Sequence, residues 1–145
     1  SEEFDEKSNS SKDHLIYHLS KWIKDQKVEI RSKVQNKGGT MRLGAYPAKI
    51  KKGTMAYSIY KKAIVSERHR HRFEVNVDYQ EALEDNGLTF SGFSQDGLLP
   101  EVVELSSHPF FLGVQFHPEL KSKPFEPHPI FSNFIKKALE QTRLV

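Results

Sequence analysis

Three apolar runs follow one another at close spacing in the second half of the chain, and the last of them stops at His117-Pro118. They predict three strands, over residues 88–94, 99–105 and 110–116. Residues 95–97 (Gln-Asp-Gly) predict a hairpin turn between the first two strands. Because the residue before a proline is pushed out of the helical region, His117 is expected to lie extended at the end of its strand. Side chains at strand ends face a cleft in α/β folds, so the pattern predicts an imidazole at the mouth of such a cleft.

Glu119 follows two places after His117, close enough for its carboxylate to bond one nitrogen of the ring. Such a contact would fix the tautomer and leave the other nitrogen as a general base, so His117 and Glu119 are candidate catalytic residues. An alternative also fits the spacing, because His-Pro occurs again at His108 and His128. In that alternative His117 only ends a strand and Glu119 is solvated.

The sequence contains no cysteine, which excludes disulfides, thiolate metal sites and thiol catalysis by these residues. No serine lies in a G-x-S-x-G motif, and Ser94 in particular lacks that spacing. A base and its orienting acid are therefore present without a nucleophile for them to activate.

Other patterns predict the remaining elements. Apolar residues at helical spacing predict a helix over residues 14–24, alternation predicts a strand over 28–34, and glycines predict a turn at 36–39. Residues 41–50 are expected to be extended, with a bulge or an edge at Gly44 and Pro47. Further pieces complete the list: a short helix at 55–60, an extended piece from 63–66, and a helix at 79–86 closed by Gly87.

A final helix is predicted over residues 129–142. Its apolar positions are expected to form a buried stripe, comprising Ile130, Phe131, Phe134, Ile135 and Leu139.

A chain of 145 residues is long enough for one domain with its own core. Residues 1–13 are acidic and serine-rich and are expected to be solvated. No apolar run approaches the roughly 20 residues that span a membrane, and no signal peptide opens the sequence, so we expect a cytoplasmic protein without a membrane partner. The net charge of +3 is scattered and does not imply a nucleic-acid partner.

Residues 67–76 form the run E-R-H-R-H-R-F-E-V-N, whose alternation puts one set of basic side chains on each face of an extended segment. Arginine can clamp a carboxylate or a phosphate with two parallel hydrogen bonds. A solvated strand face, nucleic-acid binding, and metal ligation by His69 and His71 are the alternatives. Residues 37–44 are glycine-rich, but they match neither a P-loop nor a dinucleotide fingerprint, and a turn plus a bulged strand explains them.

Taken together, these runs resemble the C-terminal part of the class I glutamine amidotransferase domain of CTP synthases. The resemblance rests on five runs: G-G-T-M-R-L-G at 38–44, E-R-H-R-H-R-F-E-V-N at 67–76, S-G-F-S-Q-D-G at 91–97, G-V-Q-F-H-P-E at 113–119 and P-H-P-I-F at 127–131. It covers about residue 31 to the end, with S-E-E-F at 1–4 as a weaker match. Other class I amidotransferases, including GMP synthase, share the F-H-P-E run.

The resemblance implies an α/β, flavodoxin-like domain with a mostly parallel central sheet and some antiparallel additions, whose N-terminal half is absent. In the family a cysteine attacks L-glutamine and releases ammonia, which a synthetase domain of the same polypeptide uses to aminate UTP to CTP with ATP and Mg. His117 would be the general base and Glu119 its orienting acid. Arg72 and Glu3 would bind the glutamine, and Arg31 lies in a region linked to the GTP effector.

The resemblance also implies that the nucleophile lies upstream of Ser1, so the chain alone is expected to be inactive and to bind no cofactor. The intact relatives are homotetramers. Two alternatives stay open: the amidotransferase part of another ligase, such as GMP synthase, and a non-catalytic amidotransferase-like binding module.

Overall fold

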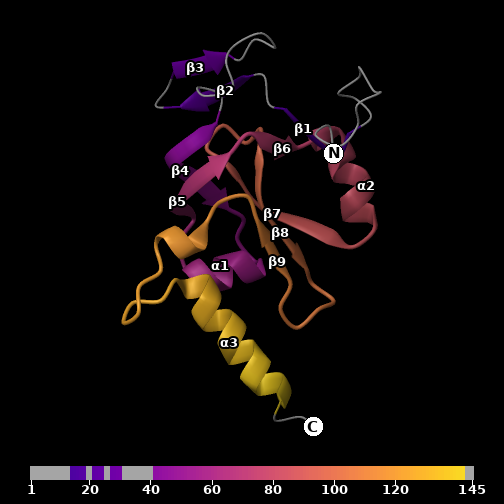
Figure 1. Ribbon diagram of the computed structural model, residues 1–145. Coiled ribbons are helices and arrows are strands. Elements are labelled where there is room, and N and C mark those ends of the chain that lie inside the picture. Colours follow the sequence, from indigo (N-terminus) through magenta and orange to yellow (C-terminus); the bar gives the residue numbers. More distant parts are fainter. Residues whose placement is uncertain (1–13, 19–20, 25–26, 31–40, 143–145) are drawn as a thin grey trace.

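The computed structural model describes residues 14–18, 21–24, 27–30 and 41–142, and the side chains of 14–17 and 41–142 (Figure 1). Four predictions lie outside the described residues: the solvated segment 1–13, the turn at 36–39, and the roles of Glu3 and Arg31.

The N-terminal described segments are strands, so the predicted helix over residues 14–24 is wrong. β1 (Ile16–His18) pairs antiparallel with β6 (Phe73–Val75), and β2 (Lys21–Lys24) pairs with β3 (Lys27–Ile30). A helix this short is marginal unless it packs on something, whereas β-branched and aromatic residues suit a paired strand. The partner of β1 lies more than fifty residues away in the chain, so the local pattern could not indicate it. The predicted strand over 28–34 is found in part as β3, and residues 31–34 lie outside the described residues.

The main sheet has five strands in the order β5-β4-β7-β8-β9, and every pair in it is antiparallel. Its strands are β4 (Arg42–Ile50), β5 (Ile64–His71), β7 (Leu88–Ser94), β8 (Pro100–Leu105) and β9 (Leu112–Val114). For the described residues, the expected mostly parallel sheet is therefore wrong. The connection between β7 and β8 is a tight hairpin, and a parallel pair needs a crossover of roughly a dozen residues or more.

β4 carries the predicted edge. Its residues up to Pro47 pair with β5 alone among the described strands, and β7 joins it only at Ala48–Ile50. A proline is tolerated there because it has no N–H to donate to a second neighbour. β9 is shorter than the predicted strand over 110–116.

The other three predicted helices form. They are α1 (Met55–Tyr60), α2 (Gln80–Asp85), which follows the 3₁₀ turn η3 (Val77–Tyr79), and α3 (Pro129–Thr142). A second 3₁₀ turn, η4 (Pro118–Leu120), follows β9. Gly87 ends α2 with φ +93°, the left-handed conformation that favours glycine.

The apolar core lies between the sheet and the start of the two helices α1 and α3, which lie side by side (Figure 1). It is made of Ala48, Ile50, Ala56, Ile59, Val65, Val102, Phe116 and Ile130. The predicted buried stripe of α3 is wrong beyond Ile130, because Phe134, Ile135 and Leu139 are 51–56% exposed. Figure 1 shows α3 running away from the sheet toward the C-terminus, so only its first turn reaches the core.

Candidate functional site

Backbone hydrogen bonds tie the segment that ends at His117 to two strands of the five-stranded sheet, β8 and β5. The N–H of Gln115 donates to the carbonyl of Glu101 on β8 at 3.0 Å, and the N–H of His117 donates to the carbonyl of Arg68 on β5 at 2.8 Å. The segment 115–117 therefore bridges β8 to β5, the strand at the far end of the sheet order, and the sheet is curled. As expected from the following proline, the backbone of His117 is extended, with φ −112° and ψ 88°.

The structure brings His117 and Glu119 together. Nδ1 of His117 lies 2.7 Å from Oε1 of Glu119, on η4. The hydrogen bond from His117 lowers the pKa of Glu119, and Arg70 on the neighbouring strand β5 adds to this effect. Because the ionised carboxylate can only accept, Nδ1 carries the proton and Nε2 carries the lone pair. The two side chains are 32% and 55% exposed, so the ring is accessible from solvent in this chain.

Arg72, the predicted carboxylate clamp, lies between the end of β5 and the start of β6 and is half-buried. Its role, like the roles of His117 and Glu119, stays a prediction. Glu3 and Arg31 lie outside the described residues.

The run at 67–76 alternates between the two faces of β5, with the arginines Arg68 and Arg70 exposed and His69 buried inside the curl. There His69 meets residues that sequence reasoning did not single out. Arg42 of β4 donates to Glu101 of β8 at 2.5 Å and to Glu74 at 3.2 Å, and its guanidinium lies over the ring of Tyr46. Burial acts to lower the pKa of Arg42, but the two carboxylates outweigh burial and raise that pKa.

A second buried polar group joins the site to the helices. Oε1 of Glu67 lies 3.0 Å from Nε2 of His128, accepts from the hydroxyl of Tyr60 at 3.1 Å, and lies 3.5 Å from Nζ of Lys121. Burial favours the protonated carboxyl, but His128, Lys121 and Tyr60 together outweigh it and lower the pKa of Glu67. Burial, and then Glu67, raise the pKa of Tyr60. These contacts hold the loop that follows η4 against β5 and α1.

Metal binding finds no support in the described part of the chain, where no three or more acidic or histidine side chains come together as a ligand set. His69 and His71 instead bond to each other, Nδ1 to Nε2, at 2.8 Å.

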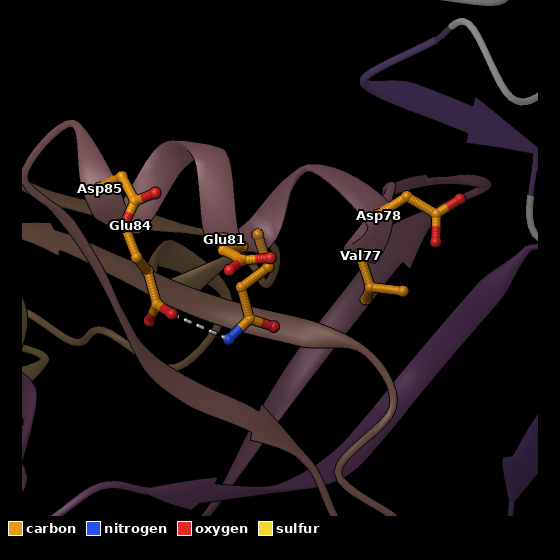
Figure 2. Close-up of a pocket in the computed structure, with 6 residues that line it drawn as sticks. Val77, Asp78, Glu81, Glu84 and Asp85 are labelled. Atoms are coloured by element: carbon orange, nitrogen blue, oxygen red, sulfur yellow. Dashed lines mark hydrogen bonds between the residues drawn. The ribbon is translucent and has the colours of Figure 1, made fainter.

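Figure 2 shows a hollow on η3 and α2, away from these residues, lined by Val77, Asp78, Gln80, Glu81, Glu84 and Asp85. It contains none of the predicted site residues, and its side chains partly satisfy one another, as in the hydrogen bond from Gln80 to Glu84 at 3.3 Å. A helix of six residues with an acidic surface does not make a binding site.

Comparison with known protein families identifies the family of this chain. The model of the glutamine amidotransferase class-I family matches residues 15–137. The chain belongs to the class I glutamine amidotransferase family.

Within that family, the sequences similar to it include those of several CTP synthases. The CTP synthase of Maricaulis maris is 58% identical over 131 residues, which cover 90% of this chain and 24% of the relative. That of Cereibacter sphaeroides strain ATCC 17029 is 54% identical over 146 residues, covering 100% of this chain and 27% of the relative. The chain thus spans about a quarter of the length of these relatives.

A solved structure, the glutaminase domain of Trypanosoma brucei CTPS with bound acivicin, superposes with a TM-score of 0.67 at 42% identity and covers 73% of this chain and 43% of that one. A Thermoplasma acidophilum protein described as a putative GMP synthase component, 16% identical with a TM-score of 0.53, shares the fold alone. No helix among the described residues is long and apolar enough to cross a membrane.

Proposed function

We propose that the chain is the part of a CTP synthase amidotransferase domain that supplies the general base and its orienting acid for glutamine hydrolysis. The 2.7 Å contact between His117 Nδ1 and Glu119 Oε1 carries the proposal. It leaves Nε2 of His117 to take a proton from a nucleophile, and the carboxylate stabilises the imidazolium that results. Arg72 would hold the α-carboxylate of L-glutamine, Glu3 would bind the same substrate, and Arg31 would lie in the region that responds to GTP.

The chain lacks cysteine, so we propose that it does not hydrolyse glutamine alone. A base and an acid without the thiol cannot form the acyl intermediate, because such residues act as a unit. The whole protein would use ATP, Mg and UTP in a synthetase domain, assemble as a homotetramer and lie in the cytoplasm.

The exposed stripe of α3 supports the same proposal. Phe131, Phe134, Ile135 and Leu139 are between 37% and 56% exposed, and monomeric proteins seldom leave such a contiguous apolar face in water. Since the chain covers 43% of the solved glutaminase domain, the occupant we propose for this face is the remainder of the amidotransferase domain.

The test is a chimera in which this chain replaces the corresponding region of the Maricaulis maris CTP synthase, with glutaminase activity as the readout. The chimera is expected to release ammonia from glutamine, and His117→Ala is expected to abolish that release. His108→Ala is the matched control, because His108 also precedes a proline but lies on an exposed turn. Full activity of the His117→Ala chimera would refute the proposed role.

The ammonia acceptor separates the alternatives. Amination of UTP favours a CTP synthase, and amination of XMP favours the GMP synthase alternative. A chimera that folds, contains the upstream cysteine and hydrolyses no glutamine would favour the non-catalytic binding module.

A further inference from the structure

A chain of hydrogen-bonding groups runs through the interior of the curled sheet. It starts at the backbone carbonyl of Phe73, which lies 2.9 Å from Nδ1 of His71. Nε2 of His71 lies 2.8 Å from Nδ1 of His69. Nε2 of His69 then faces Oε2 of Glu101 at 3.5 Å, and Oε1 of Glu101 accepts from Arg42. His69 and Glu101 are each 1% exposed.

Counting protons along this chain gives a definite result. A carbonyl oxygen can only accept, so the link from His71 to Phe73 holds a proton on His71. The link between the two rings needs a second proton, and the contact between His69 and Glu101 needs a third. Two neutral imidazoles carry two protons and a carboxylate carries none. Filling all three links therefore takes one more proton than these groups carry. This count holds whichever of the three groups the extra proton is assigned to.

Without the extra proton, two lone pairs would face each other. Nε2 of His69 and Oε2 of Glu101 are both buried and find no other hydrogen-bond partner among the described residues. Charge balance points the same way, since Arg42 would face two carboxylates, Glu74 and Glu101, in a nearly dry interior. One added proton makes the group neutral, and an uncompensated buried charge is costly.

The pKa directions agree with this count. Burial raises the pKa of Glu101 to about 7, although Arg42 opposes it. Burial, followed by the electrostatic effects of Arg42, His71 and His117, lowers the pKa of His69 to about 2. Both directions place the shared proton on Glu101, which then donates to His69. The groups that face this pair are Arg42 and Tyr46 from β4, His71 from β5, Glu74 from β6, Asp96 from the β7–β8 turn, and His117.

The pair also lies directly under the segment that carries His117. The carbonyl of Glu101 accepts from Gln115, and the carbonyl of Arg68, the residue before His69, accepts from His117. The ring of Phe116 meets the ring of His69 edge-on, with 6.0 Å between the centroids. We propose that Glu101 and His69, joined through one extra buried proton, are positioning residues that hold His117 in place. This proposal rests on the proposed role of His117.

The substitution Glu101→Gln tests the proton directly. A glutamine side chain can accept from Arg42 with its oxygen and donate to His69 with its amide, so it fills the link without an added proton. Free energies of unfolding of the chain and of E101Q are measured in urea between pH 4 and 9. Since both proteins carry the same histidines, the titration of those side chains in the unfolded state cancels in the ratio of the two folding constants.

The sign of the effect follows from proton linkage. Above about pH 4.5 the unfolded wild-type chain has released the proton of Glu101 and the folded chain keeps it, so the ratio of wild-type to E101Q folding constants falls about tenfold per pH unit. The fall ends where the folded chain loses the proton, near pH 7, after about 300-fold in total. E104Q is the matched control. Glu104 is buried on the same strand but accepts from backbone N–H groups of α1 and shares no proton with a histidine among the described residues. The ratio of wild-type to E104Q folding constants is therefore expected to stay constant between pH 5 and 8.

The positioning role is read from the ring of His117 by ¹⁵N NMR over the same pH range. In the wild type and in E104Q, the ring nitrogen signals of His117 are expected to shift where the buried proton is lost. In E101Q that shift is expected to be absent.

A wild-type to E101Q ratio that does not change between pH 5 and 7 would overturn the extra proton. An identical pH dependence of the His117 ring signals in the wild type and E101Q would overturn the positioning role. Neither measurement uses glutaminase activity, so failure of the chimera would refute the proposed function without deciding this point.

Discussion

The start of α1 depends on one buried carboxylate from a distant strand. Glu104 of β8 is 4% exposed, and its two oxygens accept from the N–H groups of Met55 at 2.8 Å and Ala56 at 3.0 Å. The first turn of α1 contains no acidic residue of its own. Thr54 satisfies a third N–H, that of Tyr57, at 3.2 Å. Glu104 therefore caps the two N–H groups that Thr54, the local N-cap, does not bond, and it also ties the helix to the sheet.

The free-energy cost of replacing Glu104 follows from the two hydrogen bonds that it accepts. A hydrogen bond to a charged group contributes roughly 1.5–3 kcal/mol, and removing the acceptor leaves a buried donor unpaired. Glu104→Ala removes both acceptors and is expected to lower the free energy of unfolding by about 3–5 kcal/mol. Glu104→Gln keeps one oxygen but turns an amide N–H toward a backbone N–H, so a loss of about 1.5–3 kcal/mol is expected.

Urea unfolding followed by circular dichroism measures both losses. Thr54→Ala is the local comparison, at about 1 kcal/mol. Glu81→Gln, on the exposed surface of α2, serves as the surface control and is expected to change stability by less than about 0.5 kcal/mol. If Glu104→Ala and Glu104→Gln both stay within that range, or if the glutamine costs as much as the alanine, the two-bond account of α1 is refuted.

Two further sets of substitutions probe the packing at Gly92 and the exposed face of α3. At Gly92 an added Cβ would lie 2.7 Å from Cγ2 of Val102 and 3.2 Å from Cδ1 of Ile50, so Gly92→Ala is expected to cost about 1–3 kcal/mol in urea unfolding. The double variant with Val102→Ala should cost less than the sum of the two single changes, and strict additivity would contradict the clash. On α3, the double change Phe134→Ser and Leu139→Ser alters side chains that are 51% and 55% exposed. It is expected to change the free energy of unfolding by less than about 0.5 kcal/mol per site in urea unfolding. A loss above about 2 kcal/mol would show that this face is already covered in the chain.

Local patterns predicted much of the second half of the chain. The strand over 88–94 and the helix over 129–142 have their predicted bounds, because each is set by apolar periodicity and by the turn residues that flank it. The contact between His117 and Glu119 could also be predicted, since the two residues are separated only by a proline that restricts the backbone. Their part in catalysis stays a prediction.

Long-range features could not be predicted in the same way. The strand at Ile16–His18 is stabilised by pairing with β6, and its own residues fit a helix as well. The exposure of Phe134 and Ile135 depends on the direction in which α3 leaves the sheet, since the stripe itself is a normal amphipathic pattern.

By itself, the sequence determined the local elements and the pairing of an imidazole with the carboxylate two places on, because periodicity, turn chemistry and a proline act over a few residues. Only the tertiary structure decided that the sheet is antiparallel and curled. That curl brings Arg42 to Glu101, 59 residues apart in the chain, and puts His69 beside them under His117. The physical reason is that these charged groups come from distant strands, so they are buried against one another only when those strands pair. A local sequence pattern does not indicate that pairing.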